Sequence, residues 1–147
     1  MNLGKLLFSF GGRINRAKFW LAQLIAVVFW IVVFFLAWVA ASPSNHAIPT
    51  ALILIASIPS MIVGAAVGIK RLHDRDKSGW WLLLFYLVPY LLFGPIGWIT
   101  GPERMLGVAL AVASAAVTIW MIVEIGCLRG TVGPNQYGPD PLEGVAT

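Results

Sequence analysis

The chain has 147 residues, of which 59% are hydrophobic and only 11% charged, whereas soluble domains average roughly 45–50% and about 25%. These values exclude an ordinary soluble domain, because a domain of about 150 residues buries only about 68–70% of the surface of its unfolded chain. One cysteine and two histidines exclude an internal disulfide and a standard zinc cluster, so we expect no metal or other cofactor. The net charge of +4 lies beside apolar segments, which indicates membrane topology rather than nucleic-acid binding.

The amino-terminal segment has an amphipathic pattern. Apolar residues recur at helical spacing over 3–10, and Gly11-Gly12 then interrupts the pattern. This predicts a short amphipathic helix that lies in the membrane interface. Asn15 is placed to cap the helix that follows.

Four apolar stretches come close to the roughly 20 residues that cross a hydrocarbon core of about 30 Å. Because an isolated span must satisfy its own backbone, each is expected to be a helix. The predicted spans cover residues 19–41, 48–69, 80–99 and 105–127. The first apolar run is too long for a signal-peptide core, so we expect it to be retained as a span.

Small residues and prolines mark the predicted spans. The second span has small residues at a four-residue step, and the last span has a matching row. Such rows allow close approach of helices, which predicts that these two spans pack together, although small residues are also common in membrane helices generally. The first span is expected to face lipid. The small residues are Ala56, Ser60, Gly64 and Gly68, then Gly107, Ala111 and Ala115, and prolines lie at 59, 89 and 95.

The predicted loop over residues 70–79 contains four basic residues and two carboxylates. Basic side chains near a membrane surface each contribute about 1 kcal/mol to binding of anionic lipid. In a catalytic interpretation, His73 is a general base oriented by Asp74, but adjacent residues rarely point at one another well enough for that role. We therefore expect no enzyme. Ser78 is expected to cap the third span.

Glu124 is the only acidic residue in the predicted spans. A charge at the bilayer centre costs at least about 2.5–3.5 kcal/mol, so such a residue usually faces protein or water. Because Glu124 lies near the inner end of its span, we expect a structural ion pair with an arginine of the cytoplasmic segments, such as Arg13, Arg16 or Arg71. Proton handling is the alternative.

Nine of the ten Lys and Arg residues fall in the amino segment, the 70–79 loop and the tail, and the positive-inside rule places all three in the cytoplasm. The fold prediction is therefore an all-α membrane protein, a four-transmembrane-helix bundle with both termini cytoplasmic. The whole chain, 1–147, is expected to form one membrane domain, with a Gly/Pro-rich cytoplasmic tail over 128–147.

Three segments in order resemble a known family. Residues 10–16 read Phe-Gly-Gly-Arg-Ile-Asn-Arg, residues 71–74 read Arg-Leu-His-Asp, and residues 133–141 read Gly-Pro-Asn-Gln-Tyr-Gly-Pro-Asp-Pro. Together they resemble the bacterial inner-membrane family of unknown function 805, the YhaH-like proteins. The resemblance implies a multi-pass protein of the bacterial cytoplasmic (inner) membrane, with an ordered tail and no established activity.

All three segments lie on one predicted side of the membrane, which suggests a single polar cluster. Its candidate members are Arg13, Arg16, Arg71, His73, Asp74, Ser78, Glu124, Asn135, Tyr137 and Asp140. The favoured hypothesis is a non-enzymatic protein whose cytoplasmic face binds membrane lipids through anionic phospholipid headgroups, or binds a membrane protein partner or a second copy of itself. The alternatives are a small oligomeric transporter or channel that uses Glu124 and the Pro-kinked helices, and a membrane enzyme that acts on headgroups through His73 and Asp74.

Overall fold

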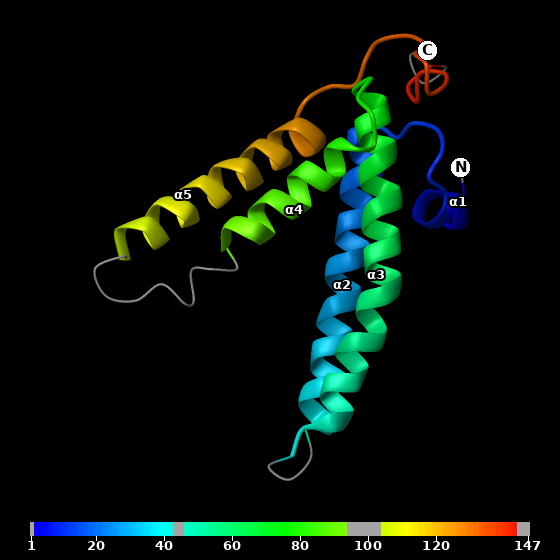
Figure 1. The fold of residues 1–147 in the computed structure, drawn as a ribbon. Coiled ribbons are helices and arrows are strands. Elements are labelled where there is room, and N and C mark those ends of the chain that lie inside the picture. Colours follow the sequence, from blue (N-terminus) through cyan, green and yellow to red (C-terminus); the bar gives the residue numbers. More distant parts are fainter. Residues whose placement is uncertain (1, 43–45, 94–103, 144–147) are drawn as a thin grey trace.

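The computed structural model describes residues 2–42, 46–93 and 104–143, and the regular secondary structure within these ranges is helical, with no strand. The helices are α1 (Leu3–Phe8), α2 (Arg16–Ala40), α3 (Ala47–Asp74), α4 (Trp81–Phe93) and α5 (Arg104–Met121), which continues as the π-helical turn η3 (Ile122–Cys127). Figure 1 shows two helix pairs, α2 with α3 and α4 with α5, that diverge from a common end. The carboxyl-terminal tail lies over that end.

Three helices are long and apolar enough to cross a membrane: α2, α3, and α5 together with η3. The fourth, α4, is apolar but has 13 residues, which at about 1.5 Å per residue give a length of about 20 Å. It begins where the third predicted span begins. The remainder of that predicted span, residues 94–99, including Pro95, lies outside the described residues.

The structure corrects the beginning of the predicted loop over residues 70–79. Residues 70–74 are not loop but the last turns of α3, which ends only at Asp74. The hydropathy pattern marks where the apolar run ends, and charged side chains at that point do not stop a helix. The stop comes at Asp76, which adopts a left-handed backbone (φ 56°) and lets the Lys77 N–H donate to the Leu72 carbonyl at 2.9 Å.

Asparagine side chains cap the amino-terminal ends of the first two helices, α1 and α2. Asn2 Oδ1 accepts from the Lys5 N–H at 2.9 Å, and Asn15 Oδ1 accepts from the Lys18 N–H at 3.0 Å. Each satisfies one of the backbone donors that a helix leaves open at its beginning. The predicted cap at Asn15 is confirmed, and the predicted amino-terminal helix is present as α1.

The predicted close packing of the second span against the small residues of the fourth span was wrong. Within the described ranges, α3 packs along α2 and α5 packs along α4, and α3 contacts the predicted fourth span at its η3 turn but not along α5. Helices joined by a short connection tend to pack as antiparallel neighbours, which favours these hairpins. Gly68 shows how the small residues are used instead: a Cβ added there would lie 2.6 Å from Cδ1 of Leu82 on α4.

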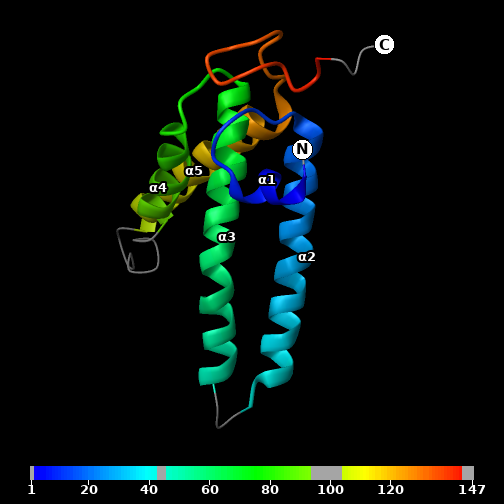
Figure 2. The ribbon, with the colours of Figure 1, turned by 90° about the vertical axis from the view of Figure 1, so that its right-hand side faces the viewer.

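The buried side chains gather near the common end of the two hairpins. Phe19 from α2, Leu72 from α3, Phe85 from α4 and Ile125 from η3 belong to one apolar cluster there. Figure 2 shows α1 lying across α2 and α3 close to this end. The remaining helical surface exposes large apolar side chains along most of its length, as expected for helices in contact with lipid.

Candidate functional site: the polar cap

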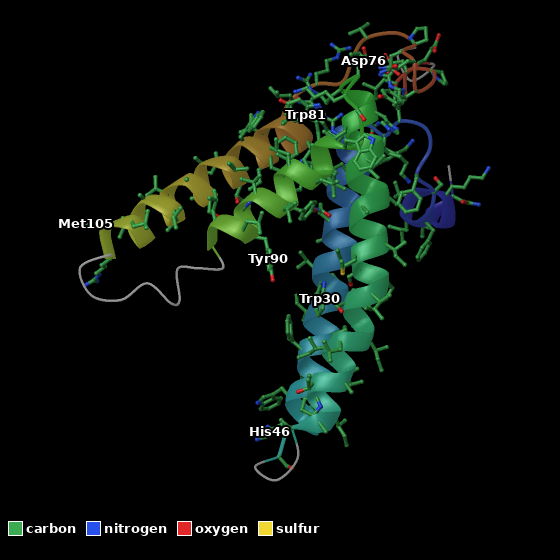
Figure 3. All side chains as sticks on the ribbon, viewed as in Figure 1. Trp30, His46, Asp76, Trp81, Tyr90 and Met105 are labelled. Atoms are coloured by element: carbon green, nitrogen blue, oxygen red, sulfur yellow. The ribbon has the colours of Figure 1, made fainter. Side chains whose placement is uncertain are left out.

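Ionisable and polar residues converge at the common end of the hairpins. We call this region the polar cap and define it as residues 12–16, 70–77 and 124–142. Figure 3 places Asp76 at this end and His46 at the opposite end of the α2–α3 pair.

The carboxylate of Asp74 lies at the centre of the polar cap between two arginines. Nε and Nη2 of Arg13 each lie 3.1 Å from Asp74 Oδ1, and Nη1 of Arg71 donates to Asp74 Oδ2. The three side chains are at most 5% exposed. Because the site is shielded from water, these charge-assisted hydrogen bonds are stronger than surface ion pairs, and loss of one partner would strand a buried charge.

Arg13 also binds the tail. Its Nη2 donates to the Thr131 carbonyl at 2.6 Å, and its Nη1 donates to the carbonyls of Gly133 (2.7 Å) and Gly138 (3.3 Å). The Thr131 N–H in turn donates to the Asp74 carbonyl at 2.8 Å. One guanidinium therefore joins the amino segment, the end of α3 and the tail.

Gly130 is required where the tail passes Asp74. A Cβ added to this glycine would lie 2.0 Å from Asp74 Oδ2. The carboxylate cannot easily move aside, because both arginines hold it. The glycine at the start of the tail thus has a steric explanation.

Five consecutive backbone carbonyls at the end of η3 accept hydrogen bonds from side chains. A helix end leaves such carbonyls without intrahelical partners, and cations near it also interact favourably with the helix dipole. The donors are side chains of α2, of the last turn of α3 and of Arg75, which follows α3. The carbonyl of Ile125 accepts from Arg71 Nε (2.7 Å), that of Gly126 from Trp20 Nε1 (3.0 Å), that of Cys127 from Arg16 Nη1 (3.0 Å), that of Leu128 from Arg71 Nη2 and that of Arg129 from Arg75 Nη1.

The tail folds back onto the end of α3. Asn135 Nδ2 donates to the His73 carbonyl and to Thr131 Oγ1, both at 2.9 Å. The Tyr137 ring stacks on the His73 ring with centroids 3.8 Å apart. His73 Nδ1 lies 3.3 Å from the Gly12 carbonyl, so the imidazole faces the amino segment and the tail.

Asp140 organises the outer part of the tail. Its carboxylate accepts the Leu142 N–H at 2.9 Å and the Gly133 N–H at 3.0 Å. These backbone donors stabilise the charged form and hold the pKa of Asp140 below its ordinary value.

Glu124 forms the expected ion pair with an arginine outside its span, but this arginine is not one of the three named. Its Oε1 lies 3.2 Å from Arg75 Nε and 3.0 Å from Lys77 Nζ, rather than near Arg13, Arg16 or Arg71. Those three arginines are bound to Asp74 or to carbonyls. The turn after α3 brings the next two basic residues to Glu124 instead.

The other predicted residues divide into two groups. Arg13, Arg71, His73, Asp74, Asn135, Tyr137 and Asp140 are joined by the hydrogen bonds and ring contact described above, and Arg16 borders them. Ser78 stands apart at the start of α4, where its Oγ accepts from the Trp80 N–H at 3.4 Å. The sequence predicted that Lys70, as one of the four basic residues of the 70–79 loop, contributes to binding of anionic lipid, but Lys70 is fully buried and donates to the Lys5 carbonyl at 2.9 Å and to the Leu6 carbonyl.

A cavity of about 260 Å³ opens in the polar cap beside the start of α2. Arg16, Arg71 and Arg129 line it, together with Asp74 and Asp140. Both carboxylates already accept hydrogen bonds from within the protein, so the side of the cavity formed by Arg16 and Arg129 is cationic. Among the described residues, no three His, Cys, Asp or Glu side chains gather as metal ligands.

Membrane-length apolar helices joined at one end by a buried polar cap define a multi-pass membrane protein. The chain belongs to the DUF805 family: residues 7–139 match this family, described as "Protein of unknown function (DUF805)". It is 31% identical to "Uncharacterized protein YiiR" of Escherichia coli (strain K12) over 140 residues, which cover 95% of this chain and 90% of that protein. It is also similar to the "Inner membrane protein" YhaH of the same strain (31% over 137 residues; 90% and 87%) and to the "Inner membrane protein" YhaI (28% over 136 residues; 92% and 88%).

The apolar helices and these relatives identify the chain as a multi-pass protein of the bacterial inner membrane. No solved structure is significantly similar to it.

Proposed function

We propose that this chain is a non-enzymatic membrane protein that spans the bilayer four times, with both termini and the polar cap in the cytoplasm, and that binds an anionic phospholipid headgroup in the cavity of the polar cap. The observation that carries the proposal is the cavity of about 260 Å³ with Arg16 and Arg129 on its wall.

The distribution of charge supports this orientation. Nine of the ten Lys and Arg residues lie in the amino segment, in residues 70–77 or in the tail, and these regions meet at one end of the helices. Arg104 begins α5 at the far end of the second hairpin. Under the positive-inside rule, the polar cap faces the cytoplasm, where anionic headgroups also produce a negative surface potential.

The hydrogen bonds indicate which charges are available to a ligand. Arg13 and Arg71 are enclosed by Asp74 and by backbone carbonyls, so they build the polar cap. Arg16 and Arg129 are exposed, and guanidinium groups present several donors in a planar arrangement that matches phosphate oxygens. The cavity therefore suits a headgroup whose phosphate leaves a net negative charge, as in an anionic phospholipid.

The competing functions find less support in the geometry. Glu124 is held by two bases at 3.0 and 3.2 Å, which favours an ion pair over proton handling. The His73 ring is stacked on Tyr137, while the Asp74 carboxylate is bound to arginines. The two side chains are thus oriented away from the mutual hydrogen bond that a general base and its orienting acid need.

The proposal is tested by native mass spectrometry of the purified, delipidated protein titrated with dioleoyl phosphatidylglycerol or dioleoyl phosphatidylcholine. We expect the wild type to prefer phosphatidylglycerol. Arg129→Gln should lower that preference about fivefold, since one basic side chain contributes on the order of 1 kcal/mol. Arg104→Gln removes the same charge far from the cavity and should have no effect. Equal retention of both lipids by the wild type, or an unchanged preference in Arg129→Gln, would refute headgroup binding here.

A further inference from the structure

The contact between α2 and α3 contains unfilled apolar space below α1. A cavity of about 350 Å³ is lined by Leu7 and Phe8 of α1, by Ala26 and Trp30 of α2, and by Ser60 and Gly64 of α3. A second cavity, of about 290 Å³, shares Phe29 and Pro59 with the first and continues to Leu36 and Leu52. We call the two together the α2–α3 groove.

We propose that the α2–α3 groove holds one acyl chain of a membrane lipid, with α1 closing its end near the polar cap. This inference is independent of the headgroup cavity, which is lined by other residues.

The α2–α3 groove is long enough to hold an acyl chain across one leaflet. Its wall on α2 runs from Ala22 to Leu36, and the fourteen helical steps between these residues, at about 1.5 Å each, extend about 21 Å. One leaflet contributes about 15 Å, half of a hydrocarbon core of roughly 30 Å. Figure 3 shows Trp30 along the middle part of α2, well below the polar cap.

The chemistry of the wall favours an apolar occupant. The lining is apolar except for Gln23 and Ser60, and Ser60 Oγ already donates to the Ala56 carbonyl at 2.9 Å. Apolar cavities remain dry even in soluble proteins. At this depth in a bilayer, the material available to fill such a space is a lipid chain.

Gly64 distinguishes the groove from ordinary close packing. A Cβ added at Gly64 would meet no atom within 4 Å, whereas one added at Gly68, a turn further along α3, would collide with Leu82. The absence of a side chain at Gly64 therefore leaves open space and does not serve a contact between helices. In Figure 2, α1 crosses both helices above this region, so the groove has walls from three helices rather than being an ordinary lipid-facing surface.

The test places a larger side chain in the groove, from α2 in one variant and from α3 in another, and measures how many lipid molecules the protein retains. The delipidated protein is titrated with dioleoyl phosphatidylcholine, whose zwitterionic headgroup does not require the cationic cavity, and bound lipid is measured by native mass spectrometry. We expect one molecule retained by the wild type and by Ala113→Leu, which adds the same side chain to an exposed position of α5. Gly64→Leu and Ala26→Leu should each weaken retention at least tenfold. Unchanged retention in both variants, or no retained lipid in the wild type, would overturn the proposal.

Two further measurements keep this result separate from folding and from the headgroup proposal. A photoreactive acyl chain on phosphatidylcholine should label wild-type peptides of α2 and α3 that line the groove; labelling spread evenly over all helices would contradict the proposal even if the filled variants unfold. Arg129→Gln should leave phosphatidylcholine retention unchanged while lowering the preference for phosphatidylglycerol. Each proposal can therefore fail without the other.

Discussion

Replacing Asp74 by Asn should destabilise the protein more than any exposed charge substitution. The change keeps the shape of the side chain but removes the one carboxylate that lies between Arg13 and Arg71. Removal of one partner from a buried ion pair costs about 3–5 kcal/mol. Both arginines keep carbonyl partners, so we expect the lower end of that range, about 3 kcal/mol. At roughly 2–4 °C per kcal/mol for a chain of this size, the unfolding midpoint should fall by about 6–12 °C.

The assay is thermal unfolding of the purified protein in detergent, combined with hydrogen exchange of the tail. Thr131 should lose protection in Asp74→Asn, because its N–H donates to the backbone of residue 74 beside the disrupted ion pairs. Asp76→Asn is the matched control, since Asp76 is exposed and Asn tolerates its left-handed backbone. If Asp74→Asn melts within about 2 °C of this control and the tail stays protected, the buried ion pairs do not hold the polar cap together.

Two other perturbations address separate parts of the polar cap. Glu124→Gln should lower the unfolding midpoint by less than Asp74→Asn does, with a loss of about 1–2 kcal/mol in the free energy of unfolding. The loss is smaller because the Arg75 and Lys77 side chains are 24% and 30% exposed and remain partly hydrated. A midpoint equal to that of the control variant Glu143→Gln would contradict a stabilising ion pair. The pKa of Asp140 is held below its ordinary value of 3.8 by backbone N–H groups, so its contribution to stability is present above that pH and is lost as the pH falls through the lowered pKa. Protection of tail amides against hydrogen exchange should therefore fall in this acidic range, and Asp140→Asn should abolish this pH-dependent part.

The helices were largely predictable because apolar length is a strong signal in a membrane. The starts of α2 and α3, at Arg16 and Ala47, lie within a few residues of the predicted positions. The end of α3 was not predictable from hydropathy, because the residues after Ile69 are charged and yet remain helical. The left-handed residue Asp76 that ends the helix carries only a weak sequence signal, since aspartate adopts this conformation less often than glycine or asparagine.

The pairing of helices was less predictable than their existence. A row of small residues indicates close approach, but it does not identify the partner helix. Gly68 accommodates Leu82 of α4, whereas Gly64, on the same predicted row, adjoins open space. Chain connectivity was the better guide, since α2 with α3 and α4 with α5 are each consecutive along the chain.

For the polar cap, the sequence predicted which residues come together better than it predicted which of them contact one another. Side chains from the three recognised segments, including Arg13, Asp74 and Asn135, are brought together by hydrogen bonds. Which basic residues pair with Glu124 was not predictable, because that depends on the turn after α3. The five capped carbonyls of residues 125–129 have no sequence signal, because any residue supplies a carbonyl and only the fold shows which ones lack a helical partner.

The cationic residues that indicate topology are in large part the residues that build the polar cap. Arg16, Arg71 and Arg75 donate to carbonyls at the end of η3, and buried Lys70 donates to the end of α1. In an apolar surrounding these carbonyls need donors, and long cationic side chains can supply them while adding favourable interaction with a helix carboxyl terminus. Loss of such a residue should therefore weaken both the charge bias and the fold. Arg129 differs because its exposed guanidinium borders the cavity, so changing it tests ligand binding with the least disturbance of structure.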